Sequence, residues 1–350
     1  MGDTPMEEGP VSLDAETPPS NVFIPPSIHR AATVRGDSYE HFSPVPPSLG
    51  ANPADASSGV PCVLGVDEAG RGPVLGPMVY GVFYLPVPLS DPLLKTTHHF
   101  DDSKVLTPAV RSSLMKTLCT PPTTASESGS LYTSCGWATA SLSARDIAAN
   151  MLRPSTSSAY NLNAQAMDAT VSLIAGVLAR GVNVREIYVD TIGQPAAYQK
   201  KLERVFPSVK ITVAKKADSL YPCVSAASVC AKVTRDAALE VLYEARAGDE
   251  TAKGAETMAW GSGYPSDARC VTWLKQNMHP VFGWGPECRF SWGTAKDMLE
   301  TKGGVKVEWP VDEDDGSSRV TDFFVGSGDR EKDADELGTW FGTPAGLEAF

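Results

Sequence analysis

The segment VLGVDEAGRGPVLGP, residues 63–77, is the best single guide to how this chain folds. A short apolar run ends in two adjacent acids, Asp67 and Glu68, and a turn rich in glycine and proline follows, with Arg71 between its first two glycines. Apolar runs of this length that are bounded by turn residues are typical of buried β-strands. The segment therefore predicts a strand that carries two carboxylates to one edge of a sheet.

Four further segments have the same strand-like character, and two longer ones have the apolar spacing of helices. The predicted strands are 62–68, 78–85, 137–143, 186–192 and 210–214. The predicted helix 160–181 places on one stripe Met167, Val171, Ile174, Val177 and Leu178. A second helix, 219–246, has small residues in its first half, which let a helix approach another backbone closely. Together these elements predict an α/β fold in which helices flank a mixed sheet.

The charge of the chain is concentrated at its two ends. The net charge of −12 divides into −6 for residues 1–59, +2 for residues 60–303 and −8 for residues 304–350. The middle can therefore carry a basic cleft, and the overall acidity does not exclude a nucleic-acid partner. Composition predicts a disordered N-terminal tail over 1–60, a folded domain over 61–303, and a largely disordered acidic tail beyond it.

The apolar runs, the cysteines and the histidines indicate which classes of protein and of site to expect. No apolar run of about eighteen residues and no secretory leader is found, which predicts an intracellular chain without a membrane span. The seven cysteines are scattered and form no Cys-x-x-Cys pair, so reduced thiols are expected rather than disulfides or a zinc site. The low-complexity segment CTPPTTASESGS, residues 119–130, predicts an exposed loop. The histidines lie outside any recognised motif and are interpreted as structural or exposed.

Two more acids follow strands in the same way as Asp67 and Glu68. Asp190 lies near the end of the predicted strand 186–192, in the segment REIYVDTIG (185–193), and Asp218 stands at the end of the segment KITVAKKAD (210–218). Residues at neighbouring strand ends converge on one crevice of such a sheet. Four carboxylates would repel each other there, and a divalent ion with oxygen ligands, Mg²⁺ or Mn²⁺, would remove that cost. Taken singly, each acid could instead be a turn cap or a surface charge.

Seven motifs in order along the chain carry a family resemblance. They are DEAGRG (67–72), DSKVLTP (102–108), YNLN (160–163), VDTIGQP (189–195), KADSLYPCVSAASVCAKVTRD (216–236), GSGYPSD (261–267) and FSWGTAKDMLE (290–300). Over about residues 62 to 300 the chain resembles the type 2 ribonuclease H family, and most of all the catalytic subunit of its eukaryotic branch. The resemblance implies a ribonuclease-H-like fold with a helical C-terminal part, so that 61–303 would be the catalytic domain.

The resemblance also implies a reaction. A type 2 ribonuclease H hydrolyses the RNA strand of RNA–DNA hybrids and cuts 5′ to single ribonucleotides embedded in duplex DNA, giving 5′-phosphate and 3′-hydroxyl ends. By matching position, the catalytic acids that would hold two Mg²⁺ or Mn²⁺ ions are Asp67, Glu68, Asp190 and Asp218. Ribonucleotide removal during DNA replication and repair, and a nuclear location, are implied in the same way.

Substrate recognition is expected at a turn and a loop. Gly70, Arg71 and Gly72 form a turn with little side-chain bulk, whose backbone could reach the 2′-hydroxyl that distinguishes RNA from DNA. Tyr264 matches the family tyrosine that packs on the sugar. A tight turn that needs positive φ, and a packed loop anchor, are the corresponding structural alternatives.

Phosphate contacts are expected from a further group of residues near the acids: Lys104, Asn161, Lys215, Lys216, Ser225, Ser228, Lys232 and Arg235. The alternative for the lysines is simple solvation, and for Asn161 it is capping of the helix that begins near residue 160.

Partners and rival functions complete the expectations. The resemblance implies two accessory subunits in a heterotrimer, docking near the C-terminal helices after residue 280. The tail segment SSRVTDFF (317–324) has the spacing of a sliding-clamp docking peptide through Val320, Phe323 and Phe324, although Ser317 replaces the usual glutamine. Those phenylalanines could instead pack back onto the enzyme or onto a partner protein. The alternatives for the whole chain are a non-catalytic, nucleic-acid-binding scaffold subunit of the same fold, and a type 1 ribonuclease H or another nuclease of that fold.

Overall fold

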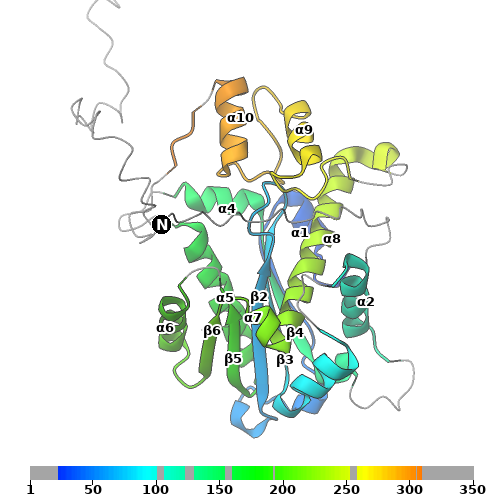
Figure 1. The fold of residues 1–350 in the computed structure, drawn as a ribbon, viewed down its shortest axis with the longest axis vertical. Coiled ribbons are helices and arrows are strands. Elements are labelled where there is room, and N and C mark those ends of the chain that lie inside the picture. The colour runs from blue at the N-terminus through cyan, green and yellow to red at the C-terminus, as the bar shows by residue number, and fades with distance from the viewer. Residues whose placement is uncertain are drawn as a thin grey trace, which may run out of the picture. The chain divides into compact units, whose positions relative to one another are not determined.

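The computed structural model describes residues 23–100, 106–122, 130–153, 160–191, 194–252, 258–304 and 306–309. These residues form the helices and strands drawn in Figure 1.

A six-stranded mixed sheet forms the centre of the fold, with strand order β1-β4-β3-β2-β5-β6 (Figure 1). The strands are β1 (Tyr39–Phe42), β2 (Cys62–Ala69), β3 (Met78–Pro86), β4 (Gly136–Leu142), β5 (Val184–Asp190) and β6 (Lys210–Ala214). β2 pairs antiparallel with β3 and parallel with β5, and β5 pairs parallel with β6. The mixed α/β sheet is confirmed, and each of the five predicted strands forms with its ends within two residues of the predicted ones.

Ten α-helices are described around this sheet. They are α1 (Arg30–Arg35), α2 (Pro108–Cys119), α3 (Leu131–Ser134), α4 (Ala144–Met151), α5 (Leu162–Ala179), α6 (Pro195–Val205), α7 (Ala217–Leu220), α8 (Pro222–Ala252), α9 (Ala268–Gln276) and α10 (Gly293–Gly303). Short 3-10 turns lie at Pro47–Leu49, Ala56–Ser58 and Val87–Leu89, and a π-helical segment spans Ser90–Thr97.

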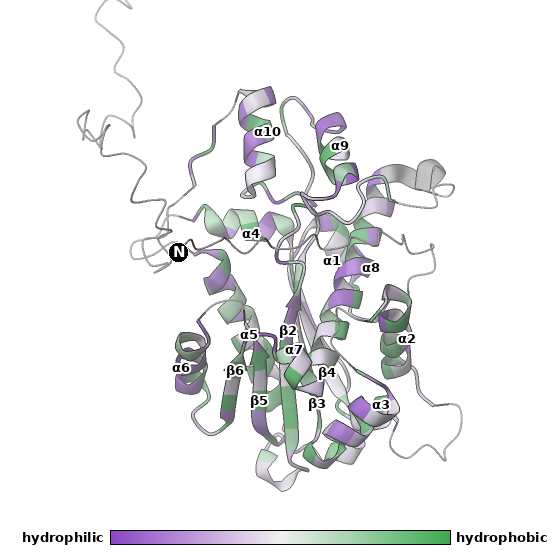
Figure 2. Cartoon of the chain, viewed as in Figure 1, coloured by the Kyte–Doolittle hydropathy of each residue, from purple (hydrophilic) through white to green (hydrophobic). Residues whose placement is uncertain are grey.

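Helices cover both faces of the sheet because successive strand residues point to opposite sides. Leu64 and Val66 of β2 join a core with α4, α5 and α6. Val63, one residue earlier, joins a second core with α2 and α8 on the other face. Figure 2 shows hydrophobic segments, in green, along β5 and α5.

The helix α5 shows the predicted apolar stripe. Ile174 and Val177 are fully buried, and Met167, Val171 and Leu178 pack partly buried against the same core. By length and composition alone α5 could cross a membrane, but its apolar side contacts the sheet. This is the environment of a core helix.

Two glycines of the sheet allow α8 to approach closely. A Cβ atom on Gly65 would lie 2.3 Å from the backbone carbonyl of Cys223, and one on Gly81 would lie 2.6 Å from the carbonyl oxygen of Ala227. Both contacts are with the first half of α8, where Ala226, Ala227 and Ala231 are fully buried. The expectation that small residues let this helix approach another backbone is confirmed, and the approach brings α8 next to the acids of β2.

A third core lies under the C-terminal helices. Trp260, Trp273 and Trp284 pack there with residues of α8, α9 and α10, and the ring centroids of Trp260 and Trp273 are 5.1 Å apart. Val74 and Leu75, which follow the glycine turn after β2, belong to the same core. The helical C-terminal part is therefore packed directly onto that turn.

The predicted N-terminal boundary is wrong over the described residues. The tail predicted for 1–60 contains α1 and β1, and β1 adds to the sheet by pairing antiparallel with β4. Just before α1, Ser27 shares a buried 2.8 Å hydrogen bond with Thr234 of α8, and Arg30 of α1 pairs with Glu244 at 2.9 Å. A helix of six residues and a strand of four are too short to show a repeating pattern of apolar residues. The Pro- and Ser-rich composition of this segment therefore predicted disorder. Residues 1–22, the predicted loop's 123–129 and the acidic tail from 310 lie outside the described residues.

Candidate active site

Three of the four predicted acids lie at the ends of neighbouring strands, and the fourth lies in a short helix after the next strand. Asp67 and Glu68 lie near the end of β2, and Asp190 is the last residue of β5. Because β2 and β5 run parallel with Val66 opposite Val189, the residues that follow these two, Asp67 and Asp190, lie side by side. Asp218 lies in α7, the short helix directly after β6.

These acids influence one another electrostatically. Burial raises the pKa of Asp67 well above its ordinary value, and the negative charges of Glu68 and Asp190 raise it further. The pKa of Glu68 is likewise raised, to about 7: burial is the main cause, Asp190 and Asp218 add to the rise, and the positive charge of Arg71 opposes it. The site therefore concentrates negative charge that needs a cation.

Hydrogen bonds orient these carboxylates. The backbone N–H of Ala217 donates to Asp190 Oδ1 at 2.8 Å, which ties the end of β5 to the start of α7. The side chain of Ser228 on α8 hydrogen-bonds Asp67, and the close approach of α8 makes this contact possible. Lys216, two residues before Asp218, has φ 57°, a left-handed conformation that lysine rarely adopts.

The donor set suits a hard divalent cation. All four side chains offer carboxylate oxygens, which Mg²⁺ and Mn²⁺ prefer. Within the described residues, however, no three acidic, histidine or cysteine side chains are already grouped as metal ligands. The four acids thus supply carboxylate oxygens from the ends of β2 and β5 and from α7.

The glycine turn and Tyr264 meet beside the acids. Gly70 has φ 75°, and a Cβ there would lie 2.7 Å from the carbonyl oxygen of Pro77. A Cβ on Gly72 would lie 3.3 Å from Cε1 of Tyr264, a residue that remains 38% exposed. The structure thus brings together the two elements that the sequence predicted for substrate recognition, and it also gives Gly70 the positive φ of the structural alternative.

Two residues that the sequence analysis did not select hold this turn in place. Arg289 is fully buried, and its guanidinium donates to the carbonyl oxygens of Gly70 at 2.6 Å, Arg71 at 3.0 Å and Gly76 at 3.0 Å. Burial lowers the pKa of Arg289 to about 9. Trp292 donates from its indole Nε1 to the carbonyl oxygen of Gly72 at 2.9 Å. Both lie beside or in the FSWGTAKDMLE motif, but nothing in their local sequence distinguishes a buried arginine from an exposed one.

Arg235 has a different environment from the one expected of a phosphate ligand. Its side chain is buried, and it donates to the carbonyl oxygen of Ser262 at 2.6 Å and to Asp236 at 3.0 Å. Its guanidinium carbon also lies 5.6 Å from the centroid of the Tyr264 ring. This geometry supports the Tyr264 loop, because Arg235 links that loop to α8.

The remaining predicted phosphate ligands differ in exposure. Lys215 and Lys216 are exposed after β6, Lys232 is half-buried, and Ser225 and Ser228 are fully buried in α8. Asn161 caps α5, with its Oδ1 accepting from the N–H of Ala164 at 2.8 Å, as its structural alternative predicted. Lys104 lies outside the described residues.

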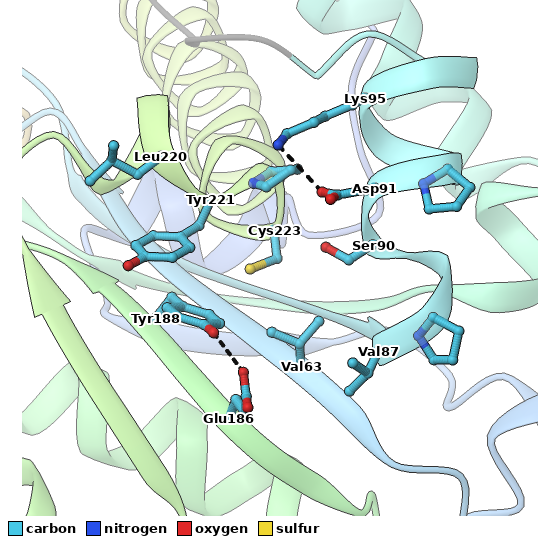
Figure 3. A pocket seen from close by; sticks show the side chains of 13 residues that line it. Val63, Val87, Ser90, Asp91, Lys95, Glu186, Tyr188, Leu220, Tyr221 and Cys223 are labelled. Atoms are coloured by element: carbon cyan, nitrogen blue, oxygen red, sulfur yellow. Dashed lines mark hydrogen bonds and ion pairs between the residues drawn. The ribbon is translucent and has the colours of Figure 1, made fainter.

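A separate cavity of about 360 Å³ lies near the opposite end of β2, where Val63 contributes to its wall. Figure 3 shows Tyr188 and Tyr221 in this wall, with ring centroids 4.0 Å apart, and the Tyr188 hydroxyl donating to Glu186 at 2.5 Å. The other lining residues are Val87, Pro88, Ser90, Asp91, Pro92, Lys95, Leu220, Pro222 and Cys223. None of the predicted site residues lines it, so this cavity is distinct from the acidic site.

Comparison with known proteins agrees with the site. The sequence model of the family described as Ribonuclease HII matches residues 64–295. The A subunit of ribonuclease H2 from Neurospora crassa is 65% identical over 329 residues, which cover 94% of this chain and 97% of that protein. The corresponding protein of Schizosaccharomyces pombe is 43% identical over 329 residues, covering 93% of this chain and 90% of that protein.

A solved structure extends the agreement to the fold. The crystal structure of ribonuclease H2 from Pyrococcus horikoshii is 28% identical, with a TM-score of 0.53 over 68% of this chain and 97% of that one. Since the family model spans more than half of the chain and the fungal relatives span nearly all of it, this chain belongs to the type 2 ribonuclease H family, the endoribonucleases of RNA–DNA hybrids, in the branch of the ribonuclease H2 A subunits.

Proposed function

We propose that this chain hydrolyses the RNA strand of hybrids and also cuts 5′ to single ribonucleotides embedded in duplex DNA, leaving 5′-phosphate and 3′-hydroxyl ends. The observation that carries the proposal is the packing of Tyr264 against Gly72, beside the acids of β2. A site for one ribonucleotide must read one 2′-hydroxyl, and here the backbone of a glycine-rich turn and an aromatic ring with a hydroxyl lie side by side.

The proposed cofactor is a pair of Mg²⁺ or Mn²⁺ ions. The ions would be held by the four acids, Asp67, Glu68, Asp190 and Asp218. Their carboxylate oxygens are suitable ligands, and their negative charges repel one another unless a cation is bound. When bound, such ions supply an activated water and stabilise the leaving 3′-oxygen.

Other residues position this site. Ser228 orients the Asp67 carboxylate, and the Ala217 N–H orients Asp190. Arg289 and Trp292 fix the carbonyls of the glycine turn, so the turn is shaped before substrate arrives.

Duplex binding is proposed for the exposed lysines that follow β6 and for Asn161, the N-cap residue of α5. Lys215 and Lys216 are exposed close to Asp218, where a phosphate backbone would pass. Arg235 acts instead by holding the Tyr264 loop, and Ser225 stays a predicted contact in the buried part of α8.

The deciding experiment uses two substrates and the purified full-length chain, alone and with its accessory subunits. One substrate is duplex DNA with a single embedded ribonucleotide, and the other is a continuous hybrid. Cleavage of the first on its 5′ side, dependent on Mg²⁺ or Mn²⁺, supports the proposal. Activity on the continuous hybrid alone would indicate type 1 specificity, and binding without cleavage in every metal would indicate a scaffold protein.

Partners and cellular role form a second part of the proposal. The relatives are named as one subunit of ribonuclease H2, which supports assembly with further subunits, and we propose two of them, docking near the C-terminal helices. A nuclear role in ribonucleotide removal, replication and repair is part of the same proposal, on the resemblance to the eukaryotic catalytic subunits. Mass spectrometry of the native complex tests the assembly: purification of the chain alone from its own cells would contradict it.

The clamp interaction is proposed on sequence spacing alone. Val320, Phe323 and Phe324 stand at the spacing of a clamp-docking peptide and lie outside the described residues. A peptide of residues 312–330 is expected to bind purified clamp weakly in a calorimetric titration. Loss of hydrolysis in a Phe323→Ala, Phe324→Ala variant would instead support packing of these residues onto the enzyme.

A further inference from the structure

A side chain outside the group of four acids holds the side chain of Arg71. Its Nη2 donates to Oδ1 of Asn163, in the first turn of α5. Its positive charge also acts on the buried Tyr80 hydroxyl, where it opposes the larger rise in pKa that burial causes. Tyr80 is the cross-strand partner of Glu68 in the β2–β3 pair, so the two side chains lie on one face of the sheet. Arg71 is thus held in place directly beside Glu68.

The guanidinium acts on Glu68 through space without pairing with it. Its positive charge lowers the pKa of the Glu68 carboxyl, against the larger rise that burial causes. In the part of the chain that the structure describes, however, no ion pair joins Arg71 to Glu68. An arginine beside a carboxylate readily closes on it in a two-pronged hydrogen-bonded pair. The side-chain carbonyl oxygen of Asn163 supplies the competing acceptor.

We propose that Asn163 is a positioning residue that holds the Arg71 guanidinium off Glu68 and thereby leaves the Glu68 carboxylate available to a divalent cation. The inference rests on the proposed function, since it takes Glu68 to be a metal ligand. Without an acceptor at position 163, Arg71 closes on Glu68, and a cation must displace it in order to bind. Partners of metal ligands typically change metal affinity by about 10- to 100-fold when they are removed.

Mn²⁺ binding to the full-length chain tests this directly, with free Mn²⁺ measured by electron paramagnetic resonance. Asn163→Leu keeps the size of the side chain and removes the acceptor, and affinity is expected to fall on the order of tenfold. Asn163→Asp keeps an acceptor for Arg71 and is expected to restore most of the affinity. Ser172→Leu, at another exposed position of α5, is the matched control and is expected to bind as the wild type does.

A double variant separates positioning from a general effect on the fold. In an Arg71→Met background no guanidinium can close on Glu68, so adding Asn163→Leu should leave Mn²⁺ affinity unchanged. A further loss in that background, or wild-type affinity in Asn163→Leu alone, overturns the inference. Failure of the wild-type chain to bind Mn²⁺ overturns the proposed metal site itself, and the two failures are therefore distinguishable.

Discussion

Nη2 of Arg289 lies 2.6 Å from the carbonyl oxygen of Gly70, a contact that joins residues 219 positions apart in the chain. The same guanidinium reaches two more carbonyl oxygens of this turn, and the side chain is fully buried. The C-terminal part of the chain therefore determines the shape of the turn that begins the candidate active site.

Replacing Arg289 tests this relationship. Arg289→Met keeps the length of the side chain but leaves three carbonyl oxygens without their donor, and unfolding free energy is expected to fall by about 2–4 kcal/mol. Urea unfolding of both proteins measures the loss. The control is Arg30→Met, which removes an exposed ion pair with Glu244 and is expected to cost under about 1 kcal/mol. Equal losses in the two variants would contradict the proposed role of Arg289.

The variant Asp190→Asn tests the role of the four acids. The amide keeps the shape of the side chain, and its oxygen can still accept from Ala217 N–H, but the negative charge is lost. Cleavage in Mg²⁺ is expected to fall by at least about a thousandfold, which corresponds to about 4 kcal/mol of transition-state stabilisation. Asp168→Asn, at an exposed position of α5, is the control. Near-normal cleavage by a folded Asp190→Asn variant would remove Asp190 from the site.

The hydroxyl of Tyr264 is expected to matter most where one ribonucleotide stands alone. Tyr264→Phe keeps the ring against Gly72 and removes the group that can bond a 2′-hydroxyl. Losing one such bond should slow cleavage at a single embedded ribonucleotide by about tenfold. The loss on a continuous hybrid should be smaller, because neighbouring ribonucleotides add contacts. Rates on the two substrates, measured side by side, decide the point; an equal loss on both argues against this role.

The close approach of α8 predicts an intolerant glycine. In Gly65→Ala the added Cβ would lie 2.3 Å from the backbone of Cys223, so either the helix or β2 must move. Overpacking of this kind typically costs about 1–3 kcal/mol, and the shift would also draw Ser228 from Asp67. Gly293→Ala is the control, since no atom lies within 4 Å of a Cβ built there. Thermal and urea unfolding compare the two; a stable, fully active Gly65→Ala variant would show that the contact is loose.

The docking of β1 is expected to weaken in acid. Burial and, to a smaller extent, the charge of the neighbouring His29 together lower the pKa of His41 from 6.5 to about 4. Between these two values the unfolded chain binds more protons at this residue than the folded chain does, so stability is retained above pH 6.5 and falls as pH drops towards 4.

The variant His41→Gln isolates this contribution. Unfolding free energy measured in urea at about pH 7 and about pH 4.5 should fall about 1 kcal/mol further in the wild type than in the variant, a figure reduced for the partial exposure of the ring. Identical slopes with pH would mean that His41 protonates freely in the folded chain.

The strands and helices near the site could be predicted because their signals are local. The apolar run before Asp67 predicts a strand, and the apolar stripe from Met167 to Leu178 predicts a helix. Each pattern is complete within one short segment of the sequence. Parallel pairing of β2 and β5 then follows from the fold class, and it brings Asp67 and Asp190 to one edge. The helix α1 and the strand β1 were missed because each is too short to repeat a pattern, and their stability comes from contacts with α8 and β4.

The residues that carry the proposed chemistry could be named from the sequence alone: four acids at or after strands, a turn with two glycines, and a tyrosine in a loop. The folded structure was needed to show which polar residues support them. Arg289 and Arg235 both lie in or beside motifs, yet one is buried against the carbonyls of the glycine turn and the other holds the loop of Tyr264. Whether a guanidinium is solvated or donates to a buried carbonyl oxygen depends on segments that are many residues away in the chain. A local sequence pattern carries no information about those segments.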